Sequence, residues 1–284
     1  MDGETVLAET AESYRNALGE RLIAAYALGS LAHGGFSPLV SDIDLGLIVS
    51  DPVRLEDAET IQAIADREKA KGSPLHKRIS VFWGTPSTLR GESAGGRFPP
   101  LDRLDLIESG RPLFGSDEAR ASLPRPRADE LLITGAQFAL EHLAGIRADL
   151  APDNELGSMR PAGGDALEEI LNPKMLVARG VRRVTKLVLF PVRFLYTAAS
   201  GQVGTNDAAV AQYLNGQAPS KPLVAAALEW RTAPSAEEAA AELLRKHMVP
   251  LYVHFIDDHV RRLSSLGEAG LMGAFREWRD RLVT

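Results

Sequence analysis

Two aspartates set into a strand-like apolar run constrain this chain more than any other feature of its sequence. The run at 42–49 reads Asp-Ile-Asp-Leu-Gly-Leu-Ile-Val, and a second apolar run lies upstream at 24–28. Successive side chains of a strand point to opposite faces, so Asp42 and Asp44 share one face. The apolar residues between and after them then point into the core. The sequence therefore predicts a buried strand that carries two carboxylates on one face.

This pair of carboxylates favours a metal site. Two carboxylates on one face repel each other, so the arrangement is costly without a cation. Mg²⁺ is bound in proteins by one or two carboxylates together with substrate phosphates. The dipeptide Gly29-Ser30 ends the upstream run, where backbone N–H groups and a hydroxyl can meet a phosphate. These parts indicate metal-assisted attack on a nucleotide phosphate. The competing interpretation is an ordinary hairpin with solvated turn aspartates.

The segment from Gly29 to Asp44 resembles the signature of the DNA polymerase β-like nucleotidyltransferase superfamily. It reads Gly-Ser-Leu-Ala-His-Gly-Gly-Phe-Ser-Pro-Leu-Val-Ser-Asp-Ile-Asp. The pair Gly34-Gly35 and the spacing more closely resemble the streptomycin and spectinomycin adenylyltransferases. Three further segments are similar to parts of those enzymes: the end of the catalytic domain, a helix-turn-helix and the final acidic-then-aromatic helix, at 101–115, 193–209 and 237–262.

The resemblance implies two domains with the active cleft between them. The expected fold class is an α/β N-terminal nucleotidyltransferase domain, with a small mixed sheet and flanking helices, over residues 1–123. An all-α helical-bundle domain over residues 124–284 follows. The clustered prolines at 124–126 mark the boundary between them.

The resemblance also implies an activity. The expected reaction is Mg²⁺-dependent transfer of an NMP, AMP from ATP or the group of another NTP, to a hydroxyl of a small molecule. An aminoglycoside-like compound is the acceptor that the family suggests. Asp42 and Asp44 would bind Mg²⁺ and serve as the catalytic residues. Gly29 and Ser30 would hold the β- and γ-phosphates, and Ser41 would support the metal-binding strand.

Two positions depart from the family pattern. The superfamily usually supplies a third carboxylate from the strand after the two aspartates, and Ser80 stands there. The family also carries a lysine before the second helix of the helix-turn-helix, where this chain has Asn206. Three interpretations of Ser80 stay open. Glu141 or Asp105 could replace the carboxylate, a single metal could serve an acceptor that is already nucleophilic, or the chain could bind nucleotide without turnover.

Charged residues in the second half fit either a site or ordinary surface. A basic run lies on the helix expected at 176–199, and its Arg182 or Lys186 could bind the triphosphate in place of the missing lysine. The run could equally be a solvated helix face. The acidic pairs at 168–169 and 257–258 fit the wall of a site for a polycationic acceptor or plain helix surface.

Composition limits the other classes of function. The 284 residues include no cysteine, which excludes disulfides, zinc–thiolate sites and a cysteine nucleophile. The net charge of −6 does not favour nucleic acid, whose binders usually carry a basic face. No signal peptide or membrane-spanning stretch is seen, so a cytoplasmic location is expected. A small-molecule acceptor is the expected partner, and the sequence leaves monomer or homodimer open.

Two other functions are alternatives to transfer onto a small molecule. A nucleotide-sensing or partner-binding module could have kept the fold and lost catalysis, as Ser80 and Asn206 favour. Nucleotidyl transfer to a protein side chain or a tRNA end is the other, although the acidic charge argues against RNA.

The hydrophobic spacing predicts the elements of both halves. Expected strands are 24–28, 42–49 and 76–83, and expected helices of the first half are 9–22 and 55–70. Expected helices of the second half are 128–149, 176–199, 206–213, 222–230 and 236–266, with a loop over 150–164.

Overall fold

The computed structural model describes residues 2–146 and 166–284. Its strands are β1 (Leu22–Leu28), β2 (Ile43–Val49), β3 (Ile79–Gly84) and β4 (Arg111–Gly115). Its α-helices are α1 (Gly3–Leu18), α2 (Gly29–His33), α3 (Leu55–Ala70), α4 (Pro86–Leu89), α5 (Pro100–Ser109), α6 (Glu118–Ala121), α7 (Ala128–Ala139), α8 (Leu167–Leu171), α9 (Pro173–Ala178), α10 (Val181–Ser200), α11 (Asn206–Asn215), α12 (Lys221–Glu229), α13 (Glu237–Leu266) and α14 (Ala269–Val283). Shorter turns are the 3₁₀-helices η1 (Gly19–Arg21) and η2 (His76–Arg78) and the π-helix η3 (Leu140–Ala144).

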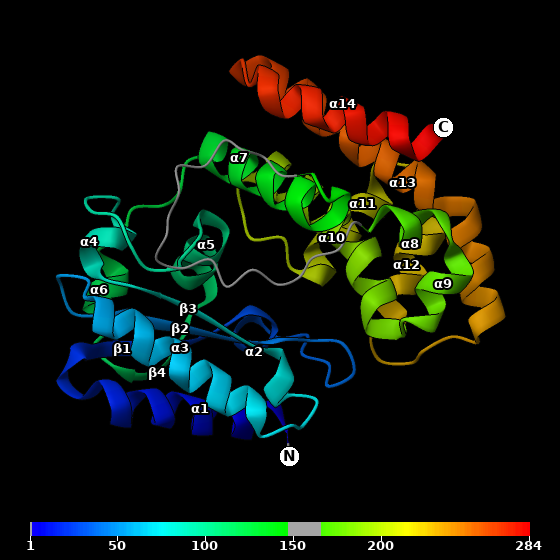
Figure 1. The fold of residues 1–284 in the computed structure, drawn as a ribbon. Helices are drawn as coiled ribbons and strands as arrows, with labels where there is room; N and C mark the ends of the chain where they lie inside the picture. Colours follow the sequence, from blue (N-terminus) through cyan, green and yellow to red (C-terminus); the bar gives the residue numbers. More distant parts are fainter. Residues whose placement is uncertain (1, 147–165) are drawn as a thin grey trace. The chain divides into compact units, whose positions relative to one another are not determined.

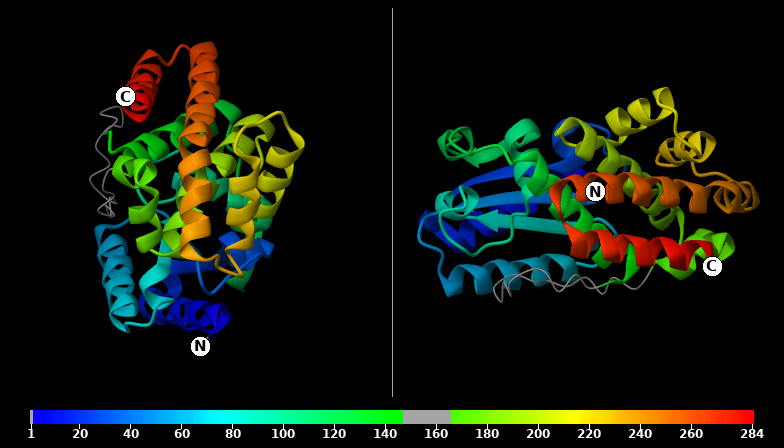
Figure 2. Two further views of the ribbon diagram at one scale, coloured as in Figure 1. Left: turned by 90° about the vertical axis from the view of Figure 1, so that its right-hand side faces the viewer. Right: turned by 90° about the horizontal axis from the view of Figure 1, so that it is seen from above.

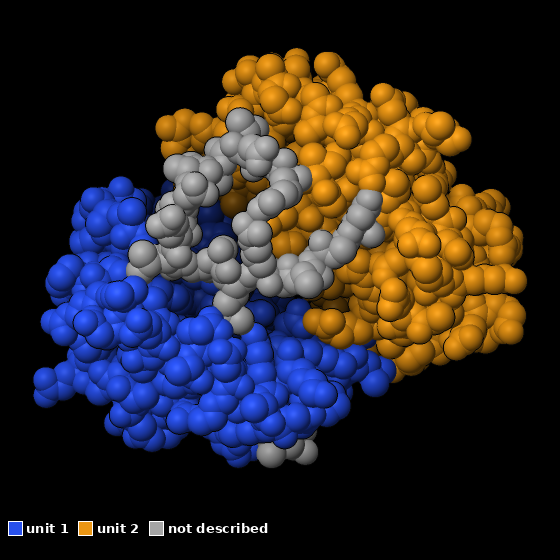
Figure 3. Space-filling view, viewed as in Figure 1, with its two compact units in different colours: residues 1–126, 152–159 blue, residues 127–151, 160–284 orange. Residues whose placement is uncertain are grey.

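The described residues form two compact units (Figure 3). The first comprises residues 2–126, and the second comprises residues 127–146 and 166–284. Buried apolar residues of the first unit form two clusters, and those of the second unit form a cluster of their own. The division therefore falls directly after the proline-rich segment at 124–126.

A mixed four-stranded sheet forms the centre of the first unit (Figure 1). Its strand order is β3-β2-β1-β4. β2 runs antiparallel to β1 and parallel to β3, and β4 pairs antiparallel with β1. The predicted small mixed sheet with flanking helices is confirmed.

Helices cover both faces of this sheet. Ile43 and Leu45 of β2 pack on one face against Tyr14 of α1 and Ile61 of α3. The other face packs against residues of α4 and α5, among them Leu106, and Figure 1 shows α5 on the side opposite α1. Because side chains alternate along β2, its two apolar sets contact different helices.

A local hydrogen bond explains where the first helix begins. The prediction placed it at 9–22, but α1 starts at Gly3 because the Asp2 carboxylate accepts a hydrogen bond from the Thr5 N–H at 2.8 Å. Val6 extends the apolar face of the helix into the core. The helix ends at Leu18, and the residues from Leu22 onward belong to β1.

Other predicted boundaries also shift. The expected helix at 176–199 is interrupted between Ala178 and Val181, so α9 and α10 are separate. The end of the expected helix 128–149 and most of the loop 150–164 lie outside the described residues. The sequence analysis missed α14, although its buried residues recur at helical spacing: Leu271, Phe275, Trp278 and Leu282.

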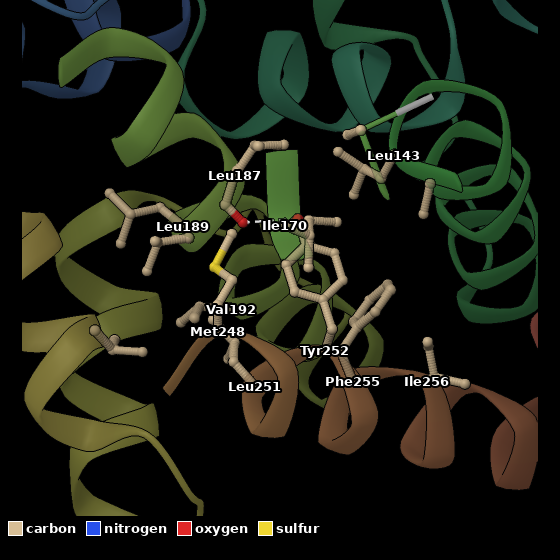
Figure 4. Packing of buried hydrophobic residues seen from close by; sticks show 14 of the residues in the cluster. Leu143, Ile170, Leu187, Leu189, Val192, Met248, Leu251, Tyr252, Phe255 and Ile256 are labelled. Atoms are coloured by element: carbon tan, nitrogen blue, oxygen red, sulfur yellow. Dashed lines mark hydrogen bonds between the residues drawn. The ribbon is translucent and has the colours of Figure 1, made fainter. Parts of the chain in front are cut away.

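The helix α13, with 30 residues, is central to the core of the second unit, and Figure 2 shows α14 running beside it. Leu251, Tyr252 and Phe255 of α13 are fully buried (Figure 4). The Tyr252 hydroxyl donates a hydrogen bond to the Leu187 carbonyl of α10 at 2.9 Å. This bond satisfies a buried phenol and joins the two helices. None of the described helices is long and apolar enough to cross a membrane.

Acid is expected to destabilise the second unit through His259. The ring is buried, stacks on Phe275 with centroids 5.6 Å apart, and its Nδ1 lies 3.0 Å from the Phe255 carbonyl. Burial lowers the pKa of His259 from 6.5 to about 4, more than the nearby Asp258 raises it. Between these values the unfolded chain binds a proton that the folded chain does not. The free energy of unfolding therefore decreases as the pH is lowered from 6.5 to about 4, by about 3 kcal/mol in total.

Urea denaturation of the full chain across this pH window measures the effect. His259→Phe is expected to flatten this part of the profile. Phe275→Leu disturbs the same stack without removing a titratable group, so it should lower stability equally at every pH. Profiles of equal slope for the wild type and His259→Phe would contradict the assignment.

Candidate functional site

The two aspartates lie where the strand β2 begins. Asp42 directly precedes β2, and Asp44 is its second residue. Both are half-buried, whereas Ile43 and Leu45 beside them are fully buried. This burial pattern agrees with the predicted alternation, which puts both carboxylates on the face opposite the α1 and α3 core.

The sheet register determines which residues flank Asp44. Leu28 of β1 lies opposite it on one side, and Ser80 of β3 lies opposite it on the other. Ser80 is half-buried. Within residues 2–146 and 166–284, no group of three or more acidic, histidine or cysteine side chains could hold a metal ion. The described part of the site therefore holds two carboxylates and a neighbouring hydroxyl.

Gly29 gives the Asp44 carboxylate the space that it occupies. Its φ is +57°, in the left-handed region, and a Cβ atom placed on it would lie 2.3 Å from Oδ2 of Asp44. Contacts that short do not occur, so a side chain at this position would displace the carboxylate. Glycine is thus required here both for its backbone conformation and for the close approach of Asp44.

Gly29→Ala is expected to disturb the position of the Asp44 carboxylate more than the fold. Backbone strain at positive φ costs about 1–3 kcal/mol, and the new Cβ would push Asp44 from its position. Gly34→Ala is the matched control, because Gly34 has φ +86° and open space around its Cβ position. Urea denaturation should show similar losses of stability for both variants. Mn²⁺ binding, followed by electron paramagnetic resonance, should be lost only in Gly29→Ala, and an equal loss in both would contradict the role of the contact.

Asp105, which lies on α5, contacts the backbone of Gly29. Its carboxylate is 8% exposed, and Oδ2 accepts a hydrogen bond from the Gly29 N–H at 2.6 Å. The sequence analysis considered Asp105 and Glu141 as replacements for the missing carboxylate. Asp105 belongs to the first unit and contacts the turn beside Asp44, but it forms no three-carboxylate cluster among the described residues. Glu141 is exposed and lies on η3 in the second unit.

The loop before Asp42 is held by side chains around it. Ser41 is buried, and its hydroxyl accepts a hydrogen bond from the Ser37 N–H at 3.0 Å. Arg78, just before β3, donates to the carbonyls of Pro38 and Leu39 at 3.0 and 3.1 Å. These bonds tie the loop both to itself and to the neighbouring strand. Ser41 therefore stabilises the approach to β2.

The two basic candidates lie on α10 of the second unit. Arg182 and Lys186 are half-buried, and the Lys186 ammonium lies 5.0 Å from the centroid of the Phe190 ring. Asn206, at the position of the family lysine, is the first residue of α11. The sequence analysis missed a cluster of aromatic rings in the second unit. Its members contact one another and are Phe138, His142, Phe190 and Phe194. The spacing of four residues between Phe138 and His142, and between Phe190 and Phe194, was the signal in the sequence.

Three of the four carboxylates in the acidic pairs at 168–169 and 257–258 form ion pairs with arginines. Glu169 pairs with Arg183, and Asp258 pairs with Arg262 at 2.6 Å. Asp257 pairs with an arginine of α14 at 2.8 Å. These three carboxylates therefore already face cations within the second unit.

Comparison with known proteins identifies a solved structure with a similar fold. Neither a scan against models of protein families nor a search of curated proteins gave a match. Among solved structures, the spectinomycin adenyltransferase AAD(9) from Enterococcus faecialis, with ATP and spectinomycin, matches with a TM-score of 0.54. The match covers 87% of this chain and 98% of that chain, at 14% sequence identity. The chain has the fold of an adenyltransferase. The predicted resemblance is thereby confirmed at the level of the fold.

Proposed function

We propose that this chain is a nucleotidyltransferase that moves AMP from ATP, or the corresponding group of another NTP, to a hydroxyl of a small molecule. The observation that carries the proposal is the placement of Asp42 and Asp44 on one face of the sheet beside Gly29. The fold shared with an adenyltransferase supports it. We further propose residues 1–123 as the nucleotidyltransferase domain, residues 124–284 as the helical domain, and a cytoplasmic location.

The donor set fits Mg²⁺. Asp42 and Asp44 would hold the ion, because two half-buried carboxylates are hard oxygen donors and Mg²⁺ takes its remaining ligands from phosphates and water. When bound, Mg²⁺ neutralises charge that develops on the phosphates during transfer. The Ser80 hydroxyl is too weak a donor to act as a third anionic ligand.

The neighbouring residues are assigned separate tasks. Gly29 leaves room for Asp44, and its N–H already donates to Asp105. Ser30 is therefore the residue of this pair proposed to donate a hydrogen bond to the β- or γ-phosphate. Ser41 holds the loop before Asp42. Arg182 and Lys186 are proposed as further phosphate ligands on the basis of their charge.

The transfer step itself needs little from the protein beyond orientation. The acceptor hydroxyl attacks the α-phosphorus, the new O–P bond forms as the bond to pyrophosphate breaks, and the acceptor proton passes to water. No third carboxylate lies with Asp42 and Asp44 among the described residues, so turnover is expected to be slow. A missing general base typically lowers the rate by about 10²–10⁴-fold.

A second candidate function is nucleotide binding without transfer. Ser80, in register with Asp44, is the observation that favours it. A protein of this kind would bind Mg²⁺ and NTP and would transmit the bound state to a partner. It would release no pyrophosphate.

One experiment separates the two candidates. The full chain is titrated calorimetrically with each of the four NTPs in the presence of Mg²⁺, and the NTP that binds is then supplied with a label on the α-phosphate. Label appearing on a compound from a panel of small hydroxylated molecules, aminoglycosides included, would support transfer. Binding with no labelled small molecule would support the second candidate. Labelling of a protein or tRNA in cell lysate would identify a macromolecular acceptor instead.

A further inference from the structure

Asp105 is a buried carboxylate whose position needs an explanation. It lies on α5 between the fully buried Leu104 and Leu106 and is itself 8% exposed. Burying a carboxylate is unfavourable unless hydrogen bonds compensate for the lost water. The other acids of α5 are more exposed: Asp102 is half-buried, and Glu108 pairs with Arg125 near the surface. The buried position of Asp105 therefore depends on what its oxygens contact.

Asp105 contacts the backbone of Gly29, the first residue of α2. Asp105 Oδ2 accepts the Gly29 N–H at 2.6 Å, although the two residues are 76 positions apart in the chain. Hydrogen bonds from a backbone N–H to a carboxylate are short and strong, because the acceptor is charged. This bond ties α5 to the point where β1 ends and α2 begins.

Gly29 transmits this constraint to Asp44. It follows Leu28, the register partner of Asp44, and the position of its absent Cβ lies 2.3 Å from Asp44 Oδ2. A small displacement of the Gly29 backbone would therefore move the Asp44 carboxylate or collide with it. Asp105, Gly29 and Asp44 form a connected series of contacts within the first unit.

We propose that Asp105 is a positioning residue, which through the Gly29 amide holds the Asp44 carboxylate in the orientation that a metal ion requires. The inference rests on the proposed function, because it assumes that Asp42 and Asp44 bind the metal. In this proposal Asp105 acts through its hydrogen bond to the Gly29 N–H, and among the described residues it joins no cluster of three ligating side chains. Residues that orient metal ligands typically change metal affinity by about 10–100-fold when they are replaced.

Three substitutions separate position from charge. Asp105→Asn removes the charge but keeps an oxygen that can accept the Gly29 N–H. Asp105→Glu keeps the charge but displaces the oxygens by one methylene. Asp105→Ala removes both. Mn²⁺ binding to the full chain, with α,β-methylene ATP present, is measured by electron paramagnetic resonance, and near-ultraviolet circular dichroism checks the fold.

If Asp105 is a positioning residue, Mn²⁺ affinity should depend on the place of its oxygen atoms more than on its charge. Asp105→Asn should lose only a few-fold in Mn²⁺ affinity, whereas Asp105→Glu and Asp105→Ala should each lose about 10–100-fold. The control Asp102→Asn, on the same helix, should bind as the wild type does. If Asp105→Ala fails to fold, the contrast between the Asn and Glu variants still decides the question.

Other outcomes overturn the inference in distinguishable ways. Wild-type affinity in Asp105→Glu or Asp105→Ala would show that the contact does not orient the site. Full loss in Asp105→Asn with affinity retained in Asp105→Glu would show that the charge itself is needed, as for a metal ligand. Absence of Mn²⁺ binding in the wild type would overturn the proposed function, and this inference with it.

Discussion

Replacing Asp44 by asparagine is expected to abolish Mg²⁺-dependent ATP binding and to lower nucleotidyl transfer by about 10³-fold or more. The amide has the size of the carboxylate, so the contact with Gly29 and the packing of β2 should remain. The negative charge through which the pair would hold Mg²⁺ is lost, and a bound metal contributes several kcal/mol of charge stabilisation in the transition state. Asp42→Asn is expected to have the same effect. Calorimetry with and without Mg²⁺ and transfer of labelled AMP measure it.

Asp51→Asn is the matched control for this experiment. Asp51 lies just beyond the other end of β2, where its carboxylate accepts a hydrogen bond from the Ser87 N–H at 3.3 Å. The same change of charge at this end should leave nucleotide binding and transfer as in the wild type. Transfer at the wild-type rate by Asp44→Asn would refute the role assigned to the pair. An equal loss of nucleotide binding and transfer in Asp51→Asn would show that the effect comes from the change in net charge and not from the position of Asp44.

Ser80→Glu is expected to supply the missing carboxylate. Ser80 is in register with Asp44 on the adjacent strand, so a carboxylate there would join the pair on the same face. A third acid should tighten Mg²⁺ binding, and if it also serves as a base it should raise the transfer rate by about 10²–10⁴-fold. Without metal, repulsion among three carboxylates should lower the thermal stability, and Mg²⁺ should restore it. Thermal denaturation and transfer assays across a Mg²⁺ series measure both effects.

Ser80→Gln is the control of equal size. It places the same bulk near the start of β3 without charge, so it should change neither Mg²⁺ affinity nor rate in the direction of Ser80→Glu. A wild type that binds no NTP, with binding gained in Ser80→Glu, would mean that the wild-type site no longer works as an enzyme. No gain from Ser80→Glu in an active wild type would mean that transfer does not depend on a carboxylate at this position.

The family resemblance predicted more of the fold than the hydrophobic spacing did. Spacing identified α3 with its bounds unchanged and found most helices of the second half, because amphipathic periodicity is a local property of the chain. It misplaced the start of α1, where the Asp2 cap decides, and it missed α14. Helix ends depend on caps and on neighbouring elements, which periodicity does not contain.

The sequence by itself determined that Asp42 and Asp44 share one face while Ile43 and Leu45 are buried, because the two-residue period of a strand is set by its own backbone. The resemblance added Ser80 as the residue at the place of the third carboxylate. Only the tertiary structure decided how these parts meet. The pairing of β2 with β3 sets Ser80 beside Asp44, and the packing of α5 brings Asp105 to the Gly29 amide. Strand register and helix packing join segments distant in the chain, so no local pattern specifies them.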